Sequence, residues 1–196
     1  MGTAYRQYLQ LVARVEAFGE AIRARYPSQI VCQPGCDACC YQQLTVFPVE
    51  AYHLARAAAA LPPAAKQQLR QHLQAAALPQ WGEPQPCVLL RQGRCSLYAA
   101  RPLLCRMHGF PLTSRLLGGR RDCCPLNFRE LPLATLEPQA VYNLDVVNCT
   151  LVAINALFVR EHGVSPQRVP IGEAVWQGLR HTAAAPLQPT DMAAAP

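Results

Sequence analysis

The sequence predicts a mainly α-helical protein with small β-hairpins, which is a small α+β fold. Segments of helical length with apolar residues at three- and four-residue spacing lie near both ends of the chain. Between them, nine of the ten cysteines are concentrated in segments with no such spacing. The 196 residues fit one medium domain, placed at residues 1–181, and the remaining residues 182–196 are predicted to be a disordered tail rich in Ala, Pro, Gln and Thr.

Three helices are predicted in the first 78 residues. Residues 3–25 form an amphipathic pattern that ends before Pro27. Pro48 suits the first turn of a second helix that runs through Leu61. The helix predicted over residues 64–78 rests on intrinsic propensity alone, and its weak apolar stripe indicates a peripheral position.

Two short hairpins are predicted in the middle of the chain, after a proline-rich linker at residues 78–86. The first hairpin pairs Cys87–Leu90 with Cys95–Tyr98 around a turn at Gly93, and Tyr98 is expected in the core. One or two helical turns then end at Gly109. The second hairpin turns at Gly118-Gly119.

The C-terminal part, residues 138–181, is predicted to be helical. Its longest helix begins at Leu144 and is closed by Gly163, and a face containing Leu151, Ile154 and Phe158 is expected to be buried. A short last helix is predicted over residues 171–180. Cys149 lies inside the longer helix, and its apolar neighbours favour a place in the core.

Composition and charge exclude several classes of protein. No uncharged apolar run approaches the roughly 20 residues that span a bilayer, so no membrane partner is expected. The first residues lack the basic-then-apolar layout of a secretory signal, which predicts a cytoplasmic location. Eight arginines in the segment 87–129 contribute to the net charge of +6. Because they coincide with cysteines, they are expected to offset thiolate charge, and nucleic-acid binding is disfavoured.

The first cysteine block, CQPGCDACC, places four thiols within nine residues. Pro34-Gly35 is expected to make a turn, after which a helical turn from Cys36 would put Cys39 and Cys40 on the same face. In a reducing compartment such a group is more typical of metal ligands or reactive thiols than of disulfides. Four sulfurs gathered by local geometry suit a thiophilic ion such as zinc or iron.

Two further blocks follow the first. Cys87 and Cys95 flank the first predicted hairpin and are expected to face each other, and Cys105 lies on the following turn. The third block, Cys123-Cys124-Pro125, adds one or two thiols. Taken singly, each of these cysteines is more typical of an ordinary buried residue, so their interpretation as ligands depends on the first block.

The chain contains the blocks CQPGCDACC, PC, GRC and LYAARPLLCR, followed by a later cysteine. The order and spacing of these blocks resemble those of the zinc- or iron-chelating cysteine-cluster family, the CxxxCxxCC proteins. The resemblance covers roughly residues 28–125. It implies a cysteine-ligated metal centre around which the fold is built. The metal ligands that it implies are Cys32, Cys36, Cys39, Cys40, Cys87, Cys95, Cys105 and one of Cys123 or Cys124, with Cys123 taken as the eighth.

Eight thiols exceed the four that one tetrahedral zinc ion takes. Two zinc sites would use all of them, whereas an iron–sulfur cluster held by Cys32, Cys36, Cys39 and one distant cysteine would leave four for another site. The x3 and x2 spacings of the first loop favour iron, and zinc stays open.

Two functions are compatible with this metal centre. The first is a metal-dependent binding or metal-handling module, with the metal ion and a candidate protein as partners. The second is a metal- or iron–sulfur-dependent enzyme that modifies a protein substrate, because the cysteine pattern also resembles flagellin lysine methylases. Arg101, Arg106 and His108 flank Cys105 and are the candidate substrate-binding residues.

Overall fold

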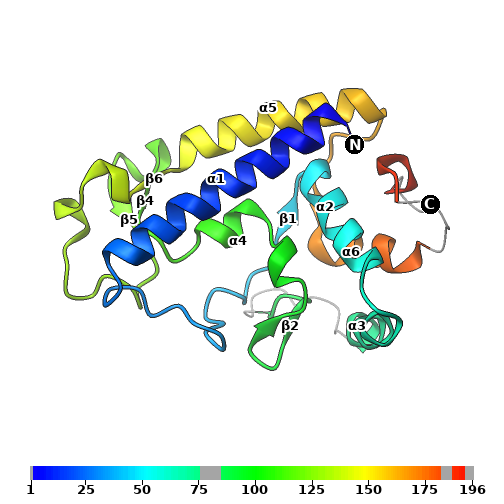
Figure 1. The fold of residues 1–196 in the computed structure, drawn as a ribbon, viewed down its shortest axis with the longest axis horizontal. Coiled ribbons are helices and arrows are strands. Elements are labelled where there is room, and N and C mark those ends of the chain that lie inside the picture. The colour runs from blue at the N-terminus through cyan, green and yellow to red at the C-terminus, as the bar shows by residue number, and fades with distance from the viewer. Residues whose placement is uncertain (1, 76–84, 182–186, 193–196) are drawn as a thin grey trace. The chain divides into compact units, whose positions relative to one another are not determined.

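The computed structural model describes residues 2–75, 85–181 and 187–192, and the chain folds as two compact units (Figure 1). Unit 1 contains residues 3–33 and 103–154, and unit 2 contains residues 34–102 and 155–196. The chain passes from one unit to the other within the first cysteine block, between residues 33 and 34, and again within the helix at residues 144–162, between residues 154 and 155. Six α-helices and several short strands lie in the described ranges, as expected for a small α+β protein. A single domain over residues 1–181 stays a prediction.

Unit 1 is built on the long N-terminal helix, which has the predicted bounds. Its buried residues include Tyr8, Val12, Val15 and Ile22, which recur at the spacing of one helical face. The short helix α4 packs against it. The elements of this unit are α1 (Thr3–Arg25), α4 (Leu103–Met107), β4 (Leu112–Thr113), β5 (Arg121–Asp122), β6 (Tyr142–Asn143) and the first part of α5 (Leu144–His162).

A three-stranded sheet with the order β5-β4-β6 completes unit 1. β4 and β5 form the predicted hairpin, in which Leu112 pairs with Asp122, and the connection contains Gly118 and Gly119. β6 pairs with β4 in parallel. This pairing joins residues about 30 positions apart and was not predicted, because a two-residue strand leaves no periodic pattern in the sequence.

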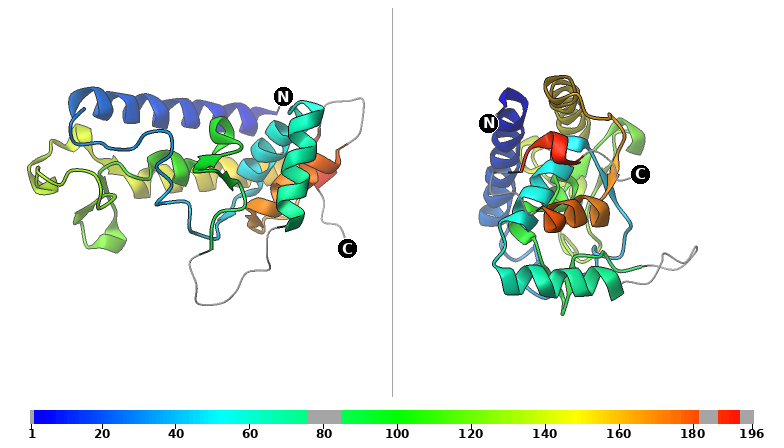
Figure 2. Two further views of the ribbon diagram at one scale, coloured as in Figure 1. Left: turned by 90° about the horizontal axis from the view of Figure 1, so that it is seen from below. Right: turned by 90° about the vertical axis from the view of Figure 1, so that its right-hand side faces the viewer.

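Unit 2 is organised around the packing of two helices, α2 and α6, which lie side by side (Figures 1 and 2). The facing residues are small. Ala51, Ala55, Ala58 and Ala174 are fully buried, and a Cβ atom placed on Gly178 would lie 2.1 Å from the carbonyl oxygen of Ala55. The elements of this unit are β1 (Thr45–Val46), α2 (Pro48–Ala59), α3 (Pro63–Ala75), β2 (Leu90–Arg91), β3 (Arg94–Cys95), the end of α5, β7 (Val169–Pro170) and α6 (Ile171–Arg180).

The β2–β3 hairpin is anchored in the core of unit 2. Leu89 and Leu97, which flank its strands, are buried and belong to the same apolar cluster as α2 and α6. Its strands are shorter than predicted. Leu90 pairs with Cys95, whereas Cys87 lies in a turn in which the Leu90 N–H donates to the Cys87 carbonyl (2.8 Å).

The remaining predictions concern the helix ends and the tail. α3 begins one residue before the predicted start and only Leu69 in it is buried, which fits a peripheral helix. Most of the predicted linker at 78–86 lies outside the described residues, as do 182–186 and 193–196 of the predicted tail. Within that tail, Leu187 is buried and its carbonyl accepts a hydrogen bond from the Tyr52 hydroxyl (2.9 Å). Among the described helices, none combines the length and apolar character needed to cross a bilayer.

Candidate metal centre

The loop that carries Cys36, Cys39 and Cys40 lies along the β2–β3 hairpin. At the tip of the hairpin, a Cβ atom placed on Gly93 would be 3.6 Å from the Cα atom of Gly35. At its base, the Cys87 N–H donates to the Cys40 carbonyl (2.6 Å). The loop is therefore in contact with the hairpin at both of its ends.

The local structure of this loop differs from the prediction. Gly35 has a positive φ of 98°, as expected for the Pro34-Gly35 turn, but no helical turn begins at Cys36. Instead, the Cys40 N–H donates to the Asp37 carbonyl (2.7 Å) and closes a single turn. The Cys40 carbonyl accepts a hydrogen bond from the Cys87 N–H of the hairpin, and the chain does not continue as a helix after the turn.

In unit 2 the thiols of Cys39, Cys87 and Cys95 each interact with the thiol of Cys40, and we refer to these four cysteines as the hairpin quartet. The pKa of the Cys40 thiol is raised to about 12, chiefly because the thiol is buried. The thiols of Cys39, Cys87 and Cys95 contribute to the same shift, and Cys39 also hydrogen-bonds to Cys40. Burial is likewise the main cause that raises the pKa of Cys87 and of Cys95. The metal-free thiols of Cys40, Cys87 and Cys95 are therefore protonated at neutral pH, and a metal that binds them must displace protons.

The two hairpin cysteines share one kind of hydrogen-bond partner. The backbone of Leu89 hydrogen-bonds to Cys87, and the backbone of Leu97 hydrogen-bonds to Cys95. Both bonds lower the thiol pKa, so the backbone N–H is the donor. A donor aimed at sulfur stabilises a thiolate, which is the form that binds a metal.

Arg101 lies close enough to Cys95 for its charge to lower the pKa of that thiol. The Arg101 guanidinium lies over the Tyr98 ring at 4.0 Å, and it donates to the Tyr98 carbonyl (3.0 Å). The prediction that Tyr98 is a core residue is wrong, because Tyr98 is 62% exposed. Its ring is instead a surface on which the arginine packs.

A second group of thiols lies in unit 1 around the buried side chain of Asn127. Its Nδ2 donates to the Gly109 carbonyl (2.6 Å) and to the Cys32 sulfur (3.4 Å), and its Oδ1 accepts from the Val31 N–H (3.0 Å). The Cys123 thiol is near the Asn127 carbonyl (3.6 Å). Asn127 therefore joins the segments that carry Cys32 and Cys123.

The other cysteines of unit 1 are less closely tied to this group. Burial, the Asp122 carboxylate and the neighbouring Cys124 raise the pKa of Cys123. Cys105 is half-buried on α4, and Cys124 is half-buried beside Cys123. Either Cys123 or Cys124 remains available as the eighth predicted ligand.

Replacing Asn127 with Leu is expected to lower the free energy of unfolding by about 3 kcal/mol. The substitution leaves the Val31 N–H and the Gly109 carbonyl without their partner, and each buried unpaired group costs about 1–3 kcal/mol. Urea unfolding followed by circular dichroism measures the loss. Asn148, which is exposed on α5, is the matched control, and its change to Leu should cost less than about 0.5 kcal/mol. Equal losses would show that the Asn127 bonds do not support unit 1.

Cys149 is not a core residue, and the prediction that placed it there is wrong. It is exposed, as are Val146 (59%) and Val152 (50%) on the same helix. The buried residues of α5 include Leu151, which is two positions away and therefore about 200° around the helix. The apolar residues next to Cys149 in the sequence led to the wrong prediction, because this helix has apolar residues on its exposed face as well.

The three candidate substrate-binding residues are not gathered in one unit. Arg101 belongs to unit 2, whereas Arg106 and His108 belong to unit 1. The Arg106 side chain is 2% exposed and forms an ion pair with Glu16 of α1, which favours a role in packing. His108 is an exposed residue whose ring is partly desolvated. That desolvation lowers its pKa, while Asp122 opposes the shift.

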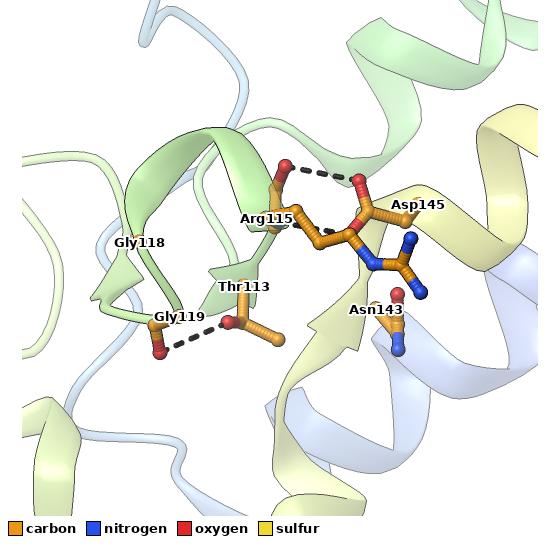
Figure 3. A pocket seen from close by; sticks show the side chains of 7 residues that line it. Thr113, Arg115, Gly118, Gly119, Asn143 and Asp145 are labelled. Carbon is orange, nitrogen blue, oxygen red and sulfur yellow. Dashed lines mark hydrogen bonds between the residues drawn. The ribbon is translucent and has the colours of Figure 1, made fainter.

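An open pocket of about 430 Å³ lies in unit 1, between the turn after β4 and the start of α5 (Figure 3). Asp145 accepts hydrogen bonds from the Ser114 hydroxyl (3.0 Å) and the Arg115 N–H (2.8 Å), so both of its carboxylate oxygens have protein donors. None of the predicted metal ligands lines this pocket.

The thiols have the chemistry of a metal site but are not yet arranged as one. All ten cysteines are free, and among the described residues no three or more His, Cys, Asp or Glu side chains are arranged to hold a metal ion. Thiolate is the preferred ligand of zinc and of iron–sulfur clusters, so the donor set of the hairpin quartet fits such a group. Binding requires the four thiols to move toward a common point.

Sequence reasoning missed the groups that support these thiols. Asn127 belongs to no recognisable sequence motif. The donors at Leu89 and Leu97 are backbone N–H groups, which every residue except proline has, so residue type does not reveal them. The repeated offset of two residues, Cys87 to Leu89 and Cys95 to Leu97, was the one pattern that could have pointed to them.

Comparison with known protein families identifies the family of this chain. The family model described as "Putative zinc- or iron-chelating domain", CxxCxxCC, matches residues 31–132, just over half of the chain. The family name writes two residues between the first two cysteines, whereas this chain has Gln33, Pro34 and Gly35 there. No curated protein and no solved structure matches the chain.

Proposed function

Since the chain belongs to the CxxCxxCC family of zinc- or iron-chelating domains, we propose that it is a metal-binding module whose cysteines hold zinc or iron for a binding or metal-handling role. The candidate ligands are the thiols of Cys32, Cys36, Cys39, Cys40, Cys87, Cys95, Cys105 and Cys123. A cytoplasmic, reducing location is part of the proposal, because it keeps these thiols free.

The observation that carries this proposal is the hairpin quartet. Thiols from two segments about 50 residues apart in sequence interact with the Cys40 thiol, and two of them receive backbone hydrogen bonds. Thiols that are buried merely as small apolar residues need neither neighbouring thiols nor donors aimed at their sulfur. These interactions support the proposal that the four thiols act as ligands.

Iron is the metal that we favour, with an iron–sulfur cluster as the form in which it binds. Thiolate ligands give such a centre negative charge, and Arg101 beside Cys95 offsets part of it. A supply of sulfide and iron in the cell is required for this form. Zinc bound by thiolates alone is the simpler outcome of the same donor set.

Protein made in iron-supplemented cells and purified without oxygen is expected to contain iron and to be brown. Elemental analysis and the visible absorption spectrum measure both. Zinc without colour would contradict the preference for iron and leave the metal-binding function intact. Protein that contains neither metal, and that takes up neither when they are added under reducing conditions, would contradict the function itself.

The enzyme alternative receives no such support. Arg106, one of its candidate substrate-binding residues, is buried in an ion pair with Glu16. A metal-binding module therefore accounts better for what the described residues do.

A further inference from the structure

We propose that the exposed face of the first half of α5 is the contact surface of a homodimer, in which a second copy of this chain packs its own α5 in antiparallel orientation. The centre of the contact is Cys149, flanked by Val146 and Val152, and we refer to these three residues as the α5 stripe. All three belong to unit 1. This inference goes beyond the proposed function and does not depend on a bound metal.

The α5 stripe exposes apolar side chains where a surface helix is normally polar. Val146 is 59% and Val152 is 50% exposed, and Cys149 is exposed as well. From residue 146 to residue 159, α5 contains no charged residue. The other long helix of unit 1, α1, has the usual pattern, since charged residues such as Arg14 are exposed on it. An exposed apolar face without charges is typical of a surface that a protein partner covers.

The three residues of the α5 stripe are evenly spaced along one side of the helix. Each is three positions from the next, so they fall within about 120° of the helix circumference, with the valines about 4.5 Å along the axis on either side of Cys149. The Thr150 hydroxyl beside them donates to the Val146 carbonyl (2.8 Å). Because this hydroxyl is already paired within its own helix, covering the α5 stripe would not leave it without a partner.

A second copy of the chain is the partner that this spacing fits. A two-fold axis through Cys149 reverses the direction of the second helix. Val146 of each copy then lies level with Val152 of the other, and the two Cys149 side chains meet at the axis. A two-fold contact requires a surface that is complementary to itself, and the α5 stripe, with a valine at the same offset on either side of its centre, has that property.

Charge also favours a second copy over a different protein. The chain carries a net charge of +6, so two copies repel each other on average. At the α5 stripe they can approach without bringing like charges together, because residues 146–159 are uncharged. A strongly charged partner would be recognised by opposite charges, and this stretch of α5 provides none.

The first test is analytical ultracentrifugation of the full chain over a range of concentrations. One helix face is smaller than the roughly 800 Å² per partner that a stable complex buries, so we expect a reversible dimer. Its fraction should rise with protein concentration up to about 1 mM, the weakest dissociation constant that still describes a specific contact. A chain that is monomeric over this whole range would overturn the inference.

A charge placed in the α5 stripe should weaken the dimer. Val152→Glu is expected to raise the dimer dissociation constant at least about tenfold, because the two-fold axis places the carboxylate in the contact twice, each time against a valine of the other copy. Val31→Glu is the matched control, since Val31 is 49% exposed in unit 1 and lies outside α5. This variant should dimerise like the native chain. Circular dichroism checks that both variants are folded, and equal dissociation constants for the two would contradict a contact at α5.

A short bismaleimide cross-linker tests the position of the two-fold axis. It joins two thiols, and a cross-linked peptide pair that contains Cys149 twice can come only from two chains. Mass spectrometry should find this pair in the native chain and in Val31→Glu but not in Val152→Glu. Cys149→Ser should lose the pair and still sediment as a dimer. A dimer that never gives the Cys149 pair would overturn the proposed contact. Since zinc and iron content plays no part in these measurements, their outcome is independent of the proposed function.

Discussion

Removing the metal with a chelator is expected to lower the thermal midpoint of unit 2 by about 10 °C. A ligand present at about 1,000 times its dissociation constant stabilises the folded form by about 4 kcal/mol. For a chain of this size, each kcal/mol shifts the midpoint by about 2–4 °C. Thermal unfolding followed by circular dichroism, with zinc and with excess chelator, measures the difference.

The structure also predicts where the metal-free protein loosens. Leu89 and Leu97 keep the base of the hairpin in the core without help from a metal. The loop at 35–40 is held mainly by the backbone hydrogen bond from Cys87 to the Cys40 carbonyl and by the contact between Gly35 and Gly93. We therefore expect this loop to lose its order first. Hydrogen exchange should increase there and change little in α2 and α6. The Cys149→Ser variant should show the same midpoint shift as the native chain. An unchanged midpoint on chelation would contradict a stabilising metal.

Replacing Gly178 with Ala is expected to destabilise unit 2 by about 3 kcal/mol or more. The new Cβ atom would lie 2.1 Å from the Ala55 carbonyl oxygen and 2.7 Å from its Cα atom. Both are backbone atoms, so no side chain can move aside and the helices α2 and α6 must separate. Overpacking of this kind typically costs about 1–3 kcal/mol, and the extreme contact places this case at the upper end. Urea unfolding followed by circular dichroism measures the change.

Gly172 is the matched control for this substitution, because it lies in the same helix. A Cβ atom there would be 3.4 Å from the nearest Val88 methyl group, which is close to an ordinary contact. Alanine also has the better helix propensity, by about 0.8–1 kcal/mol. Gly172→Ala should therefore be neutral or stabilising. Two variants of equal stability would contradict the close packing of α2 on α6.

The sequence was informative wherever a local pattern had a single physical meaning. The bounds of α1 follow from its apolar spacing and its terminal proline, and the turn at Gly118-Gly119 follows from two adjacent glycines. Local patterns misled where the partner of a residue lies far along the chain. The apolar neighbours of Cys149 placed it in a core that lies on the other side of its helix. The helical turn expected at Cys36 does not form, and the Cys40 carbonyl instead accepts a hydrogen bond from the backbone N–H of Cys87.

The sequence by itself determined that this is a small α+β protein with three cysteine blocks of the kind that chelate zinc or iron, because residue types and their spacing are local properties. The tertiary structure alone decided which thiols meet. Cys40 is one residue from Cys39 and 47 residues from Cys87, yet it interacts with both, since the hairpin returns to the loop. Cys32 is only four residues from Cys36 but belongs to the other compact unit. A metal centre is defined by such contacts in space, which spacing along the chain does not contain.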